Sequence, residues 1–129
     1  MVLDTSALLA MLFAEPERDA FLDRLANARD PIISAATLLE ASIVMYARTG
    51  TSGVEDLDRL LNAAGVRCVA VDREQAVAAR DGYARFGKGQ APAGLNFGDC
   101  FAYALAKSLG RPLPFKGDDF DRTDLATVE

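Results

Sequence analysis

Residues 1–13 read MVLDTSALLAMLF, and this stretch decides the fold class. Val2-Leu3 is a short apolar strand that ends at Asp4. Thr5 or Ser6 can cap the apolar helix that follows, from Ala7 to Phe13. A buried strand that leads directly into a helix is the repeating unit of a parallel sheet, so the N-terminus predicts an α/β protein.

The same alternation recurs along the rest of the chain. Ile32-Ile33 is a second apolar strand, and Ser34 can cap a long helix that reaches about Arg48 and ends at Gly50. The pattern predicts further helices after Pro16 and over 54–64, 73–85 and 97–109, further strands over 68–71, 113–115 and 126–128, and a glycine-rich loop over 87–96. We therefore expect a single domain, 1–129, built as a three-layer α/β/α sandwich with a central parallel sheet.

Composition limits the class of protein. Half of the 129 residues are hydrophobic, which is enough for a core, but the longest apolar run, Ala7–Ala14, is far shorter than the roughly 20 residues of a membrane span. No basic leader opens the sequence, so we expect a cytoplasmic protein without a membrane anchor. Cys68 and Cys100 form no CxxC pair, and we expect both to be buried as small apolar residues.

The chain contains no histidine. This excludes a Ser-His-Asp triad, a Cys-His dyad, histidine metal sites and a ribonuclease mechanism with two histidines as acid and base. If the protein is an enzyme, carboxylates, hydroxyls or lysines must supply its chemistry.

Three acidic residues interrupt apolar surroundings. Asp4 follows a strand at the sheet edge where α/β proteins bind ligands, although a helix cap is the alternative. Glu40 is the only charge between residues 35 and 47, so it needs a cationic partner, a metal ion or a partly exposed polar strip beside Thr37. Asp99 is the only charge of FGDCFAYALA; it is either a first-turn helix residue or, with Asn96 as the cap, free to point inward.

A fourth acidic position follows the expected strand at 113–115. Asp118 and Asp119 lie in FKGDDF, either in a plain turn or in a loop that presents one carboxylate beside the other three. Three or four carboxylates cannot all ionise close together without a cation, and oxygen-only ligands suit Mg²⁺ or Mn²⁺. Such a site hydrolyses phosphodiesters, and Thr5 and Ser6 can orient its carboxylates.

These motifs together resemble those of the PIN-domain VapC toxins. The resemblance covers the whole chain in order, through VLDTSA at 2–7, Leu39-Glu40, NFGDCFA at 96–102 and FKGDDF at 115–120. It implies a Mg²⁺-dependent endoribonuclease, a homodimer and a cognate VapB-like antitoxin. It also carries over Asp4, Glu40, Asp99 and Asp119 as catalytic metal ligands, with Asp118 as the alternative to Asp119.

The distribution of charge fits an RNA substrate better than the total of −5 does, although charge alone favours an ordinary mixed surface. Residues 1–79 carry a balance of −5, whereas residues 80–122 carry +2 even with the proposed ligands counted as negative. The side chains we expect to hold the RNA backbone are Arg85, Lys88, Lys107, Arg111 and Lys116. Phe97 or Tyr83 can stack on a base, or either can belong to the core.

Three other classes compete with this interpretation. A phosphoacceptor receiver domain needs an acidic pair after its first strand, where this chain has Asp4 alone. A haloacid-dehalogenase-like phosphatase needs a second Asp at position 6, which is Ser6. A catalytically inactive PIN-like domain that binds RNA or a partner is the remaining alternative, and the intact acidic set argues against it.

Overall fold

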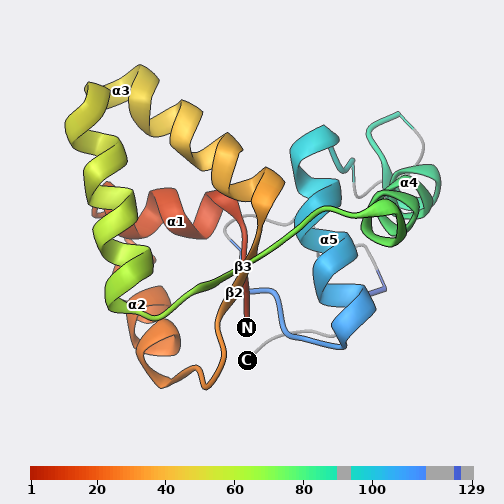
Figure 1. Ribbon diagram of the computed structural model, residues 1–129, viewed down its shortest axis with the longest axis horizontal. Coiled ribbons are helices and arrows are strands. Elements are labelled where there is room, and N and C mark those ends of the chain that lie inside the picture. The colour runs from red at the N-terminus through yellow and green to blue at the C-terminus, as the bar shows by residue number, and fades with distance from the viewer. Residues whose placement is uncertain (90–93, 116–123, 126–129) are drawn as a thin grey trace.

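The computed structural model describes residues 1–89, 94–115 and 124–125. A parallel sheet of three strands, in the order β1-β2-β3, runs through the middle of this part of the chain (Figure 1). The strands are β1 (Val2–Leu3), β2 (Ile32–Ser34) and β3 (Arg67–Val69), with Val2 opposite Ile32 and Ile33 opposite Cys68.

Helices cover both faces of the sheet. In Figure 1, α1 (Thr5–Leu12), α2 (Arg18–Asn27) and α3 (Ala35–Ala63) lie on one side, and α4 (Arg73–Phe86) and α5 (Phe97–Leu109) lie on the other. Alternating strand residues separate two cores. Val2 and Ile32 pack with α4 and α5, whereas Leu3 and Ile33 pack with the first three helices. The expected three-layer α/β/α sandwich is confirmed.

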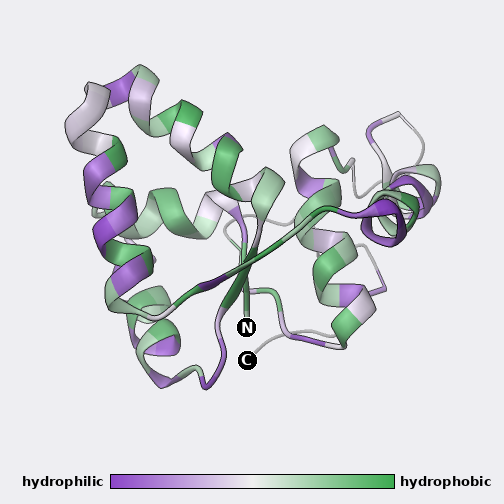
Figure 2. Ribbon diagram, in the orientation of Figure 1, coloured by the Kyte–Doolittle hydropathy of each residue, from purple (hydrophilic) through white to green (hydrophobic). Residues whose placement is uncertain are grey.

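The helices begin and end where the sequence provides caps. Ser34 caps α3 through a bond from the Ala36 amide, and Gly110 ends α5 in the left-handed conformation, with φ 60°. Gly50, at φ 68° and ψ −152°, bends α3 into two arms, so the expected separate helices over 35–48 and 54–64 meet at a kink. Apolar residues of both arms pack in the core and the outer face of the second arm is largely polar (Figure 2), whereas Leu39, Ile43 and Tyr46 of the first arm are exposed.

Two local expectations about the chain were wrong. Helix α1 is capped by Asp4, not by Thr5 or Ser6, because the Asp4 carboxylate accepts the amides of Ser6 and Ala7. No regular strand forms at 113–115 within the described part of the chain, although the Val2 amide donates to the Pro112 carbonyl at 2.8 Å. Pro112 and Pro114 have no amide hydrogen, so they cannot donate to a ladder beside β1.

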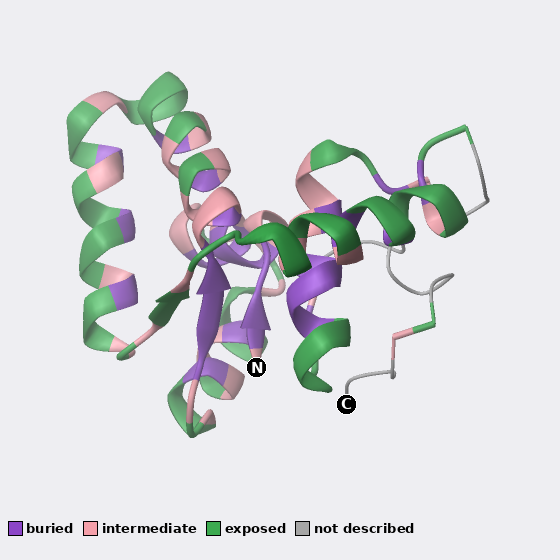
Figure 3. Ribbon diagram, turned by 45° about the vertical axis from the view of Figure 1, so that its right-hand side comes forward, coloured by how far each residue is buried: buried purple, intermediate pink, exposed green. Residues whose placement is uncertain are grey.

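The strand β3 forms an exposed edge of the sheet. Arg67 and Cys68 are exposed, in contrast to the buried strands β1 and β2 (Figure 3). The expectation that Cys68 is buried was therefore wrong: β1 and β3 are both edge strands, but only β1 is covered by packed helices on its two faces. Cys100 is buried as expected. The strand expected at 126–128 lies outside the described residues.

No helix in the described part of the chain is long and apolar enough to cross a bilayer.

Candidate metal centre

Asp4 lies where β1 ends and α1 begins, and its side chain is buried. It accepts the Ser6 hydroxyl at 2.8 Å and the Ala7 amide at 3.2 Å. Burial raises the pKa of Asp4 from 3.8 to about 6; the hydrogen bonds from Ser6 and Ala7 oppose the rise, and the negative charge of Asp99 adds to it. Asp4 is thus a helix cap and also a carboxylate that resists ionisation beside a second acid.

Glu40 reaches the same region from the second turn of α3. The Thr5 hydroxyl donates to its Oε1 at 2.5 Å, which ties α3 to the residue after Asp4. The Glu40 carboxylate also lies against Gly98 in the first turn of α5, so closely that a Cβ at position 98 would overlap it. The Thr5 hydroxyl and the Gly98 backbone together fix the position of the Glu40 carboxylate. Because glycine has no side chain, position 98 leaves room for that carboxylate.

Asp99 follows Gly98 and takes part in a capping box. Its amide donates to Asn96 Oδ1 at 2.9 Å, and its own Oδ2 accepts the Asn96 amide at 3.0 Å. The expectation that Asn96 caps α5 is therefore confirmed. The Asp99 carboxylate is engaged at its own helix end, so it is not free to point inward as we expected.

These contacts connect three acids from three elements in one region of the molecule. Thr5 links Asp4 to Glu40, Gly98 links Glu40 to Asp99, and the charge of Asp99 acts on Asp4. Within the described residues, no three acidic or thiol side chains are close enough to hold a metal ion as they stand. Asp118 and Asp119 lie outside the described residues.

The donor set nevertheless suits a divalent cation. All three groups are carboxylates, two of them are oriented by hydroxyls, and a buried acid next to a second acid gains from a positive charge. Any residue larger than glycine at position 98 would overlap the Glu40 carboxylate. Gly98 was not among the site residues that we predicted. Its one signal in the sequence is its place in the first turn of an expected helix, where glycine lowers helix stability.

The expected RNA-contact residues do not all lie together. Arg85 and Lys107 pair with Asp124 at 3.1 and 2.9 Å, and Arg85 also stacks on Phe86. Arg111 binds Asp30, which precedes β2 and is thus at the end of the sheet opposite Asp4. Lys88 lines a cavity next to Asn96, and Lys116 lies outside the described residues.

Comparisons with known proteins agree on one family. The PIN-domain family model matches residues 1–125. Ribonuclease VapC of Mycolicibacterium smegmatis is 54% identical over 130 residues, with 99% of each chain covered. Ribonuclease VapC30 of Mycobacterium tuberculosis is 50% identical over 128 residues, which cover 99% of this chain and 98% of the relative. The crystal structure of VapC20 of Mycobacterium tuberculosis, described as a sarcin-ricin loop cleaving toxin, superposes with a TM-score of 0.77 at 18% identity, over 98% of this chain and 97% of that one.

Proposed function

Because this chain belongs to the PIN-domain family, we propose that it is a VapC-type endoribonuclease toxin whose metal centre is formed by Asp4, Glu40, Asp99 and Asp119. The enzyme is a hydrolase that cuts RNA phosphodiester bonds. Asp118 is the alternative to Asp119. The metal is a divalent cation, and Mg²⁺ is our first choice, with Mn²⁺ as the second, because every ligand offers oxygen.

One observation carries this assignment more than any other. The Glu40 carboxylate lies between the Thr5 hydroxyl and the Gly98 backbone, and so joins the elements that hold Asp4 and Asp99. A helix cap or a solvent-facing acid needs no such arrangement. A buried carboxylate beside a second acid, with its pKa raised by burial as that of Asp4 is, is a common mark of a functional site.

Each side chain has a defined task in the reaction. These carboxylates would hold a divalent cation, which when bound would supply a more acidic water and a positive charge against the phosphate. Asp4 and Glu40 keep their orientation through Ser6 and Thr5, so their oxygens need little rearrangement on binding. Asp99 stays at the N-terminus of α5, where the helix dipole favours its charge. With no histidine in the chain, attack by water replaces the cyclic-phosphate route.

This route defines substrate and products. A water nucleophile does not need the ribose 2′-hydroxyl, so the fragments carry a 5′-phosphate and a 3′-hydroxyl. Single-stranded or loop RNA is the expected substrate, because unpaired nucleotides can be splayed into a protein site. We further propose that the enzyme is a cytoplasmic homodimer, with the exposed side chains of Leu39, Ile43 and Tyr46 on α3 at the subunit contact.

The partner that silences such a toxin is a VapB-like antitoxin. A basic residue of that antitoxin is expected to enter the acidic cluster, because a guanidinium matches clustered carboxylates in charge and geometry. It would exclude both the cation and the phosphate. A basic-to-alanine scan of the antitoxin tail tests this; inhibition that survives every substitution would favour steric occlusion.

The function itself is tested with purified protein and end-labelled RNA. Cleavage should stop in a chelator and return with Mg²⁺ or Mn²⁺. Full activity in the chelator would remove the metal from the mechanism. Tight RNA binding with no cleavage under any cation would support the catalytically inactive alternative instead.

A further inference from the structure

A cavity of about 610 Å³ opens between α4 and α5, beside the first turn of α5. Its walls are mostly apolar. Three aromatic rings, those of Tyr83, Phe97 and Phe101, line it together with the small side chains of Ala79 and Cys100. This volume is within the range of cavities that bind small organic ligands.

Phe97 is the most unusual residue of this cavity. Its side chain is 79% exposed, more than any other large hydrophobic side chain that the structure describes. The ring stands edge-on to Phe101, with centroids 4.9 Å apart and planes at 81°. Tyr83, also exposed, donates its hydroxyl to the Lys88 carbonyl at 3.3 Å. Because most of Phe97 is not packed in the core, the exposed face of its ring is available to stack on a planar group.

The cavity and the acidic cluster share the first turn of α5. Phe97 directly precedes Gly98, whose backbone touches the Glu40 carboxylate, and Asp99 comes next. Because Phe97 lines the cavity and Asp99 is two residues later, the cavity and the acids share one helical turn. Asn96, which caps this turn, also lines the cavity.

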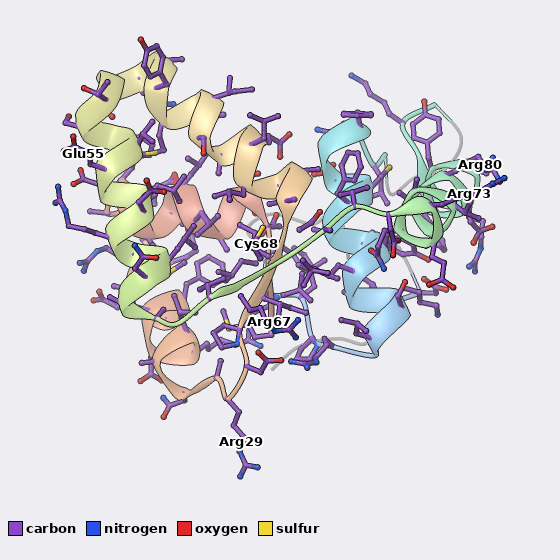
Figure 4. The ribbon with its side chains drawn as sticks, in the orientation of Figure 1. Arg29, Glu55, Arg67, Cys68, Arg73 and Arg80 are labelled. Atoms are coloured by element: carbon purple, nitrogen blue, oxygen red, sulfur yellow. The ribbon has the colours of Figure 1, made fainter. Side chains whose placement is uncertain are left out.

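Two cations border the cavity. Arg80 and Lys88 both line it, and neither forms an ion pair within the described residues. Arg85, one turn beyond Arg80 on α4, is by contrast paired with Asp124. Figure 4 shows Arg80 projecting from α4, the helix that also bears Arg73. In a chain of net charge −5, two cations that have no ion pair among the described residues and lie beside an apolar cavity favour an anionic ligand with an apolar part.

We propose that this cavity binds one unpaired nucleobase of the RNA, next to the phosphate that is cut, and that Phe97 is the ring on which this base stacks. The base stacks on Phe97, and Arg80 and Lys88 hold the neighbouring phosphates. The inference rests on the proposed function and extends it to a base-binding pocket. A second copy of this chain is the competing occupant, and Lys88 at the cavity argues against it because lysine is depleted at protein interfaces, although aromatic residues and arginine are enriched there.

The experiment removes the base without touching the phosphate. Wild-type protein cuts a short RNA in which each nucleotide around the cleaved bond is replaced in turn by an abasic one. At one position, loss of the base should lower kcat/KM about tenfold or more. In Phe97→Ala the intact RNA should already be slow, and removal of the same base should change its rate less than about twofold. Phe97→Trp should restore the dependence on the base. Leu109→Ala, at the other end of α5, is the matched control.

The outcomes separate the competing accounts. If wild-type protein cuts no RNA with any cation, the proposed function fails. If it cuts RNA but Phe97→Ala is slowed equally on intact and abasic substrates, the base pocket is wrong. If Phe97→Ala also turns a dimer into a monomer in light scattering, the cavity belongs to a subunit contact, and the inference is overturned.

The roles of Arg80 and Lys88 are tested by the salt dependence of RNA binding. Arg80→Ala and Lys88→Ala should weaken RNA binding for all sequences and lower the slope of log affinity against log salt by about one each. Arg73→Ala, two turns away on α4, should leave the slope unchanged. Equal slopes for all three variants would contradict the role of Arg80 and Lys88.

Discussion

Asp4→Asn should make the protein more stable while it destroys activity. In the absence of a cation, burial raises the pKa of Asp4 from 3.8 to about 6, so at neutral pH the fold must hold a charge that it disfavours. The folded protein binds this proton more tightly than the unfolded chain does. The contribution of Asp4 to the free energy of unfolding is therefore largest below pH 3.8 and is lost as the pH rises from about 4 to about 6.

The size of the effect follows from the two pKa values. At 1.36 kcal/mol for each tenfold change, the interval from 3.8 to about 6 corresponds to about 3 kcal/mol at pH 7. Asparagine has the same shape, carries no charge and can still accept the Ala7 amide as a helix cap. For a domain of this size we expect the melting temperature to rise by roughly 10 °C in a chelator.

The assay is thermal unfolding of wild type and variant, with chelator and with millimolar Mg²⁺ or Mn²⁺. The cation should stabilise the wild type and reduce the difference in melting temperature between the two proteins, because it binds only the charged cluster. Asp72→Asn is the matched control: Asp72 caps α4 through the Gln75 amide but is exposed. If Asp4→Asn melts at or below the wild-type temperature at pH 7 without metal, the reasoning about the buried charge is refuted.

Three further predictions concern other parts of the account. Gly98→Ala should displace the Glu40 carboxylate and lower the cleavage rate by about 10²-fold with unchanged circular dichroism; near-normal cleavage would show that the contact is unimportant. Asp124→Asn should lower the melting temperature at neutral pH. Burial opposes ionisation of Asp124, but hydrogen bonds from Lys107 and Tyr103 lower its pKa to about 2, so the stability lost in the variant should shrink as the pH falls from 3.8 towards 2. A stability loss that does not depend on pH would point to packing instead. The RNA fragments should be degraded by a 5′-phosphate-dependent exonuclease, whereas resistant fragments with a 2′,3′-cyclic phosphate would contradict attack by water.

The fold could be predicted from the sequence because local signals and burial agree. Apolar strands lead into capped helices at Leu3–Thr5 and at Ser34–Ala35, and this order alone indicates a parallel sheet with helices on both faces. The errors arose where backbone chemistry or position in the sheet decides the outcome. Prolines on both sides of Leu113 prevent a ladder, and Cys68 is exposed because its edge strand, unlike β1, is not covered by the two helical cores.

The site could be predicted only in part. Isolated carboxylates in apolar stretches mark Asp4, Glu40 and Asp99, because a buried charge needs a reason. The sequence contains no comparable signal for Gly98, whose importance depends on a contact with a residue 58 positions earlier. The same holds for Arg80. It resembles any exposed helix cation until the cavity beside Phe97 is known.

The central claim is that the carboxylates around Asp99 perform metal-dependent RNA cleavage. It is tested most directly by cleavage of end-labelled RNA by Asp99→Asn in Mg²⁺ or Mn²⁺, with Asp58→Asn, an exposed acid on α3, as the control. Asparagine can still accept the Asn96 amide, so the start of α5 should persist. The account predicts cleavage at least about 10²-fold slower than wild type for Asp99→Asn and a wild-type rate for Asp58→Asn. Cleavage by Asp99→Asn at the wild-type rate would contradict it.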